Sequence, residues 1–334
     1  TNTGRPRPLR LHMLSAAQHE AVTSEAARPL QILAGPGSGK TRVLTSRVAH
    51  LVRDSAAPIA PERCVVVTFT NRAANEMRAR LETMIGADRT RRLVLGTFHA
   101  VCVRFLRRWG TRLGLDPRFT IADTDDARPL PRDVDRDAPV DATLAAISRA
   151  KAHGWTPDEL RASAQHAPGS PAHTEHLALC RTYAAYQQQL RTSHALDFDD
   201  LLLLGVRLFR EHPELTTHID HVLVDEFQDT NAVQYELLRR LSRHVSVVGD
   251  PDQSIYSWRH ADVRHIERMH LDFPGLHRVL LEENYRSTPQ ILEAALRVMQ
   301  QDPHRLPKGL YTALASGPPV SVVACHDADD EALF

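Results

Sequence analysis

A glycine-rich stretch between an apolar run and an amphipathic segment constrains this chain more than any other feature. The apolar run is Leu30–Ala34, and residues 34–41 have the sequence Ala-Gly-Pro-Gly-Ser-Gly-Lys-Thr. Apolar residues then recur at helical spacing as far as Leu51. Glycines let backbone N–H groups close around phosphate oxygens, and a helix N-terminus adds a favourable dipole. The order strand, loop, helix therefore predicts a phosphate-binding loop in an α/β fold.

The side chains of this loop have separate expected roles. Lys40 would reach the β and γ phosphates of ATP, and the hydroxyl of Thr41 would bind Mg²⁺. The generic pattern has glycine where this chain has Ala34, so an ordinary glycine-rich turn is the alternative for the stretch taken alone. The residues expected to contact the nucleotide are Gly35, Pro36, Gly37, Ser38, Gly39, Lys40, Thr41 and Arg42.

A second apolar run supplies the acidic partner that a phosphate loop requires. His221–Val224 is followed directly by Asp225 and Glu226. We expect Asp225 to hold Mg²⁺ through water and Glu226 to activate the attacking water. Two adjacent acids at a strand end are also common surface residues, so the prediction depends on the phosphate loop in the same chain.

Apolar runs alternate with helical segments along much of the chain. This alternation favours a parallel sheet covered by helices on both faces, with ligands at the carboxyl ends of the strands. The strand signal disappears between Trp109 and His194, which predicts an inserted all-helical subdomain. A further strand is expected at Val320–Ala324. The other expected strands are Cys64–Phe69, Leu93–Thr97, His221–Val224, Val245–Val248 and Arg278–Leu281.

Composition is that of a globular protein and leaves the partner open. Hydrophobic residues make up 42% of the 334 and charged residues 25%, so a core can form, and the length favours more than one domain. Lys plus Arg equals Asp plus Glu, at 41 each, so any nucleic-acid surface must be a local patch. The four cysteines have no C-x-x-C spacing, and no run of eighteen apolar residues occurs. We expect an intracellular protein without a membrane segment.

Residues 225–229, with the sequence Asp-Glu-Phe-Gln-Asp, resemble motif II of the UvrD/Rep/PcrA family of superfamily 1 DNA helicases. Other segments are similar to the Q motif, to motifs Ia, Ib, III and IV and, at residues 197–201, to the family's usual approach to motif II, in the family's order. The match covers most of the chain, and the expected helical insert is its least motif-like part. The matching segments are residues 14–18, 67–74, 96–100, 197–201, 248–259 and 283–288.

The resemblance implies further roles at the ATP site. Gln18 would read the adenine edge, and Tyr285 would stack on the adenine ring. Gln228 and Gln253 would link the γ-phosphate to DNA. Arg286 would be an arginine finger, because a guanidinium beside the transferring phosphoryl group neutralises developing charge. The expected catalytic residues are therefore Lys40, Asp225, Glu226, Gln253 and Arg286.

The resemblance also implies that motifs Ia, Ib and III lie along single-stranded DNA. Binding of single-stranded DNA without sequence preference requires aromatic rings that stack on the bases and cations that contact the phosphate backbone. Aromatic residues at strand ends are otherwise often core residues. Four arginines on a later helix, at positions 104, 107, 108 and 112, either extend the phosphate contacts or face solvent. The expected DNA-binding residues are Phe69, Thr70, Asn71, Arg72, Thr97, Phe98, His99, Tyr256, Trp258 and Arg259.

The resemblance implies a division of the chain into four parts. Residues 1–110 and 197–300 would form one RecA-like domain, with residues 111–196 inserted as a helical subdomain. Residues 301–334 would begin a truncated second RecA-like domain. Because the family's C-terminal helicase half would be missing, we expect the isolated chain to bind ATP and single-stranded DNA weakly and to unwind almost nothing.

The implied function is that of the N-terminal motor half of an ATP-dependent DNA helicase. It would couple Mg-ATP hydrolysis to 3′ to 5′ movement on single-stranded DNA and unwind duplexes at single-strand/double-strand junctions, in repair, replication or recombination. Such a protein would lie in the cytoplasm or nucleoid of a bacterium or in the nucleus of a eukaryote. The alternatives are the motor of a helicase-nuclease, a regulatory ATP-dependent DNA-binding module and a P-loop metabolite kinase.

Overall fold

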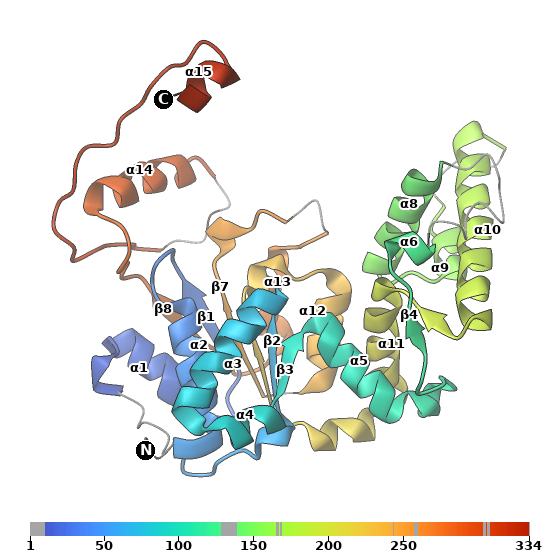
Figure 1. Cartoon of the computed structure of the whole chain (residues 1–334), viewed down its shortest axis with the longest axis horizontal. Helices are drawn as coiled ribbons and strands as arrows, with labels where there is room; N and C mark the ends of the chain where they lie inside the picture. The colour runs from blue at the N-terminus through green and yellow to red at the C-terminus, as the bar shows by residue number, and fades with distance from the viewer. Residues whose placement is uncertain are drawn as a thin grey trace.

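A computed structural model describes residues 11–127, 139–164, 167, 169–242, 244–256, 260–302, 305 and 308–333. Within these ranges, six strands form one parallel sheet in the order β3-β2-β6-β7-β1-β8 (Figure 1). The α/β class and the parallel sheet are confirmed. The strands are β1 Leu30–Ala34, β2 Cys64–Thr68, β3 Val94–Thr97, β6 His221–Val224, β7 Val245–Gly249 and β8 His277–Leu281.

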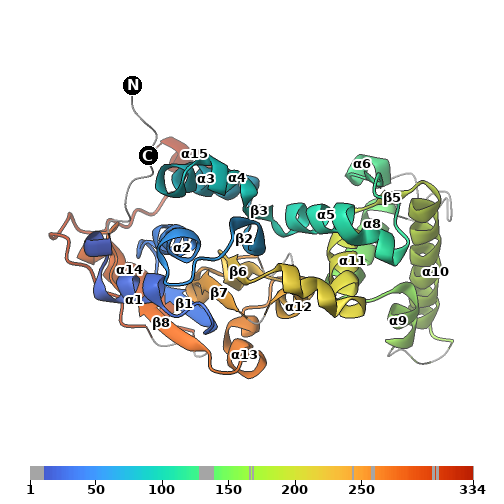
Figure 2. The same ribbon diagram turned by 90° about the horizontal axis from the view of Figure 1, so that it is seen from below.

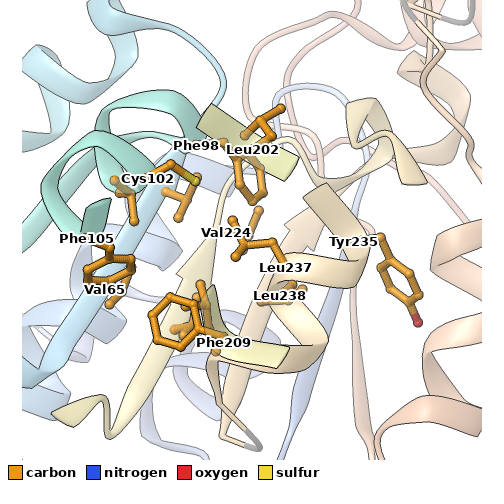
Figure 3. Packing of buried hydrophobic residues seen from close by; sticks show 14 of the residues in the cluster. Val65, Phe98, Cys102, Phe105, Leu202, Phe209, Val224, Tyr235, Leu237 and Leu238 are labelled. Carbon is orange, nitrogen blue, oxygen red and sulfur yellow. The ribbon is translucent and has the colours of Figure 1, made fainter. Parts of the chain in front are cut away.

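The sheet is buried on both faces because successive side chains of a strand point to opposite sides. In β2, Val65 and Val67 lie in one hydrophobic core, whereas Cys64 and Val66 lie in the other. Figure 3 shows the first core, in which Phe98 packs with other apolar side chains. Residues of α1, α2 and α3 contribute to the second core, and residues of α5, α11, α12 and α13 to the first.

The helix after the phosphate loop forms as predicted, as α2 Lys40–Ala49. Ser15 caps the first helix through a capping box with Gln18. Outside the insert, the described α-helices are α1 Ala16–Thr23, α2 Lys40–Ala49, α3 Asn71–Ile85, α4 Ala87–Arg92, α5 Phe98–Trp109, α11 Phe198–Glu211, α12 Ala232–Leu241, α13 Arg264–Asp272, α14 Pro289–Met299 and α15 Ala328–Leu333.

A helical insert follows α5 and has its own hydrophobic core. Its helices lie to one side of the sheet, away from α14, in both views (Figures 1 and 2). Two short strands, β4 Thr120–Ile121 and β5 Ala195–Leu196, pair in parallel at its base, so the insert is mainly helical and the all-helical expectation is wrong on this point. The helices are α6 Thr124–Ala127, α8 Val140–Ala152, α9 Pro157–Ala162 and α10 Pro171–Thr192.

The strand expected at Val320–Ala324 is wrong. No strand forms there, and Val320 and Val322 are 52% and 95% exposed. Residues with high strand propensity need a neighbouring strand and a core to pack against, and among the described residues no strand pairs with this segment. In the described part of the chain, no helix is both long and apolar enough to cross a bilayer.

Candidate nucleotide site and nucleic-acid surface

Strand order brings four of the predicted motifs together. Strands β6, β7, β1 and β8 are consecutive neighbours in the sheet. Because they are parallel, the segments that follow their carboxyl ends share one edge of the sheet. These segments are the acidic pair after β6, residues 250–256 after β7, the phosphate loop after β1 and residues 282–288 after β8. The segments after β2 and β3 extend the same edge on the other side of β6.

The phosphate loop has the backbone conformation that its glycines predict. Gly37 and Gly39 have φ angles of 66° and 87°, in the left-handed region that favours glycine. A Cβ on Gly37 would also lie 2.7 Å from the Cβ of Arg286. Helix α2 begins at Lys40, directly after the loop, so the first backbone N–H groups of a helix face this site.

Three hydrogen bonds to carbonyl groups of the loop hold it from outside. The side-chain amide of Gln18 donates to the carbonyl of Ser38 at 2.9 Å. The backbone N–H of Tyr285 donates to the carbonyl of Gly37 at 3.0 Å. The side chain of Asn284 donates to the carbonyl of Pro36. Gln18 is buried and also completes the capping box of α1, so it supports the loop whatever it does toward adenine.

Tyr285, the expected adenine-stacking ring, and Arg286, the expected arginine finger, are both exposed beside the phosphate loop. Asn284 is 1% exposed, and its side-chain oxygen accepts the backbone N–H groups of Arg286 and Ser287 at 2.8 and 2.7 Å. This turn directs the two exposed residues to the loop. Asn284 lies in the matching segment 283–288, but no role was expected for it, because its burial is not visible in the sequence.

The acidic pair lies at the end of β6, and its two members differ in environment. Asp225 is buried, and its pKa is raised to about 7, first by burial and then by the charge of Glu226. Glu226 has a φ of 48°, a left-handed conformation that is uncommon for a residue with a side chain. Strained backbone at a site is typical of functional residues held by their surroundings.

The donor set fits Mg²⁺. A buried carboxylate with a raised pKa is stabilised in its charged form by a cation, and Asp225 is such a group. Mg²⁺ prefers one or two carboxylate or hydroxyl oxygens together with substrate phosphates and water. Thr41 lies in the first turn of α2 and carries the required hydroxyl.

Gln228 connects the ends of β6 and β7. Its amide nitrogen donates to the carboxylate of Glu226 at 2.9 Å, and its amide oxygen accepts the backbone N–H of Asp250 at 3.0 Å. The amide of Gln253 donates in turn to the side chain of Asp250, whose carboxylate lies 3.9 Å from the ammonium of Lys40. One chain of polar contacts therefore joins the acidic pair, the segment after β7 and the phosphate loop. No role was expected for Asp250 from its place in the matching segment 248–259.

Two aromatic pairs lie beyond the strands. The rings of Phe69 and Tyr256 lie 5.1 Å apart, which brings the segments after β2 and β7 into contact. His99 makes an edge-to-face contact with Phe198 at 5.8 Å. Burial lowers the pKa of His99. Phe198 is 50% exposed and lies in the matching segment 197–201, for which no DNA contact was expected, so its place beside His99 was not predicted.

The polar residues of this surface divide into caps and exposed groups. The hydroxyls of Thr70 and Thr97 accept backbone N–H groups and cap α3 and α5. Asn71 and Arg72 are exposed at the start of α3, and the guanidinium of Arg72 lies 3.2 Å from the carboxylate of Glu76. These positions leave Asn71 and Arg72 accessible to a ligand.

Not all of the residues expected to bind DNA lie on the surface beyond the strand ends. The prediction for Phe98 is wrong, because this residue is 4% exposed and its ring lies in the core (Figure 3). Packing of the Phe98 ring against α11 and β6 is more favourable than leaving the ring in solvent at the end of the strand. Trp258 and Arg259 lie outside the described residues. Of the later arginines, Arg104 and Arg107 donate to backbone carbonyls of the chain itself, which favours a structural role.

Comparisons with known proteins agree on one family. The model of the UvrD/REP helicase N-terminal domain matches residues 14–274. The chain is 41% identical to the ATP-dependent DNA helicase PcrA of Leuconostoc citreum over 95% of this chain and 43% of that protein. It is 38% identical to the protein of the same name from Staphylococcus aureus strain Mu50, over 97% and 45% respectively. The chain thus spans less than half the length of these curated relatives.

Proposed function

Because the chain belongs to the UvrD/REP helicase family, we propose that it is the ATP-binding part of a DNA helicase motor. It hydrolyses Mg-ATP and uses the energy to move 3′ to 5′ along single-stranded DNA and to unwind duplexes at junctions. The observation that supports this most is the polar chain that joins Glu226, Gln228 and Asp250 across neighbouring strands. A phosphate loop, an acidic pair and the half-buried aromatic pair Phe69 and Tyr256 share one edge of the sheet with it.

In this proposal, each residue around the nucleotide has its own role in ATP hydrolysis. Lys40 and the N–H groups of the loop bind the phosphates, and Tyr285 stacks on the base. Glu226 accepts the proton of the attacking water. Arg286 neutralises charge that develops on the γ-phosphate. Mg²⁺, held by Thr41 and Asp225, supplies further charge neutralisation when it is bound.

Coupling to DNA follows from the segment after β7. Gln228 senses the γ-phosphate side through Glu226, and the hydroxyl of Ser254 donates to the carbonyl of Gln228 at 3.4 Å. Tyr256 comes two residues later and packs on Phe69. A shift of Gln228 on hydrolysis is therefore transmitted to the aromatic pair on which a base would stack.

The proposed motor is divided into a RecA-like domain, an insert and the start of a further part. Residues 1–110 and 197–300 form the RecA-like domain, and residues 111–196 form the insert. Residues 301–334 lead toward a second RecA-like part, since the curated relatives are more than twice as long as their matched region. Single-stranded DNA and its junctions with duplex are the proposed nucleic-acid partners.

ATP binding and steady-state ATPase, each measured with and without a single-stranded oligonucleotide, test the proposal. The samples are the 334-residue chain and a longer polypeptide, of the relatives' length, that contains it. We expect the oligonucleotide to raise the ATPase of the longer protein many-fold, and Lys40→Ala to abolish it. We expect weak binding and almost no unwinding from the 334-residue chain. ATPase that is indifferent to DNA would instead support a P-loop phosphotransferase and exclude the motor.

A further inference from the structure

The segment after α14 returns to the nucleotide site. The side chain of Leu310 covers Gly35, where an added Cβ would lie 2.3 Å from the leucine Cδ2. Tyr311 donates its backbone N–H to the carbonyl of Glu282 at 3.1 Å and accepts the N–H of Asn284 at 2.8 Å. This segment is therefore fixed to the strand end after β8, next to the phosphate loop.

Lys308 enters the site from this segment as a buried cation. Its side chain is 1% exposed and forms an ion pair with Asp250, which is completely buried. The ammonium also lies 3.0 Å from the carboxylate of Asp252, to which Arg305 donates from 3.0 Å. A lysine is rarely buried to this degree without carboxylate partners, and here it has two.

Asp250 therefore lies between two lysines. Lys308 contacts one of its carboxylate oxygens, and Lys40 lies 3.9 Å from the other. The remaining contacts of this carboxylate come from the amide of Gln253 and from the backbone N–H of Asp252, at 3.2 Å. A buried carboxylate requires a close cation, and Lys308 meets that requirement without Lys40.

We propose that Lys308 is a positioning residue for Lys40, which it leaves free for the phosphates of ATP by neutralising Asp250. This inference rests on the proposed function, in which Lys40 binds the phosphates. Without Lys308, the uncompensated charge of Asp250 draws Lys40 toward itself, since attraction between charges is strong where water is excluded. Lys40 must then leave a buried partner before it can bind ATP.

Lys308 acts through Asp250 and not by touching the nucleotide. Its side chain is buried, and its contacts are carboxylates of the segment after β7. Loss of Lys308 therefore affects ATP binding only while Asp250 carries a charge. This dependence distinguishes positioning from a general structural role. If Lys308 only stabilised the fold, its loss would weaken ATP binding whether residue 250 is a charged aspartate or a neutral asparagine.

The test measures the dissociation constant of ATP for variants of the 334-residue chain. We expect Lys308→Met to raise this constant by about tenfold, as loss of one partner of a buried ion pair implies. Lys308→Arg keeps the charge and retains most of the affinity. The double variant Asp250→Asn with Lys308→Met recovers affinity relative to Lys308→Met alone, because the charge that attracts Lys40 is gone.

A matched control is available in the helical insert. Lys151 is also a buried lysine with two carboxylate partners, Asp197 at 2.6 Å and Asp200 at 2.8 Å. Lys151→Met should lower the unfolding midpoint and leave ATP affinity unchanged. Unchanged or tighter binding by Lys308→Met, or no recovery in the double variant, would overturn the positioning role. A wild-type chain that binds ATP no better than Lys40→Ala would refute the proposed function itself.

Discussion

The side-chain amide of Asn284 donates a hydrogen bond of 2.7 Å to the carbonyl oxygen of Pro36. This bond joins the turn after β8 to the phosphate loop after β1, across 248 residues of sequence. Asn284 is buried, and its other amide atom orders the turn that carries Tyr285 and Arg286. Asn284 therefore both supports the phosphate loop and orders the turn that carries the two exposed side chains.

We predict that Asn284→Ala weakens both stability and ATP binding. The change leaves partly buried backbone groups without their side-chain partner, which costs roughly 1–3 kcal/mol in the free energy of unfolding. The loop also loses one of its supports, so the dissociation constant of ATP rises. Urea denaturation and nucleotide titration measure the two effects. Asn231→Ala, which removes the N-cap of α12, is the control and should lower stability by about 1 kcal/mol without weakening ATP binding.

We predict that Glu226→Gln separates binding from hydrolysis. The amide cannot accept a proton from water, so the ATPase rate should fall by about 10²- to 10⁴-fold. Nucleotide affinity should stay within a few-fold of wild type, because the phosphate loop and Lys40 are unchanged. Single-turnover hydrolysis and equilibrium titration measure the two quantities. Wild-type hydrolysis by this variant would remove Glu226 from the proposed role.

The pKa of Asp225 predicts a pH dependence of stability. This pKa is raised from 3.8 to about 7 by burial and by Glu226, so the folded chain binds the proton more tightly than the unfolded chain. The stability from this proton is full below pH 3.8 and is lost as the pH rises through about 7.

Asp225→Asn, which is neutral at every pH, should therefore be more stable than wild type at pH 8 without Mg²⁺ or nucleotide. The difference should be on the order of a few kcal/mol and should shrink as the pH falls from 7 toward 4. Urea denaturation at several pH values provides the measurement, with the exposed Asp88→Asn as the control. A difference that stays constant over this range would contradict the raised pKa.

We predict opposite effects for two phenylalanines that follow neighbouring strands. Phe69 packs on Tyr256 at the edge of the sheet, so Phe69→Ala should weaken binding of single-stranded DNA by about 1–3 kcal/mol. Phe98 lies in the core, so Phe98→Ala should lower the free energy of unfolding by about 3–5 kcal/mol. Fluorescence anisotropy with a labelled oligonucleotide measures DNA affinity, and urea denaturation measures the free energy of unfolding, for both variants. The reverse pattern would show that the surface is assigned wrongly.

Local pattern was sufficient for the six strands of the main sheet and for the phosphate loop. The apolar run of Leu30–Ala34 is continuous because a central parallel strand is buried on both faces. Gly37 and Gly39 have the left-handed backbone that a phosphate loop requires, and this requirement depends on the loop's own residues. Asp225 and Glu226 directly follow a strand, so their place at its end was also visible in the sequence.

Tertiary structure decided the rest, because apolar spacing does not state which segments become neighbours. Phe69 and Phe98 follow their strands in similar ways, but only Phe98 meets the core between β6 and α11. Val320–Ala324 has strand composition but no strand beside it within the described residues. Asn284 and Lys308 reach the phosphate loop because β8 pairs with β1 and the chain returns along that edge. The sequence determined the parts of the site through local backbone and burial preferences, whereas strand order and long-range contacts determined which parts meet.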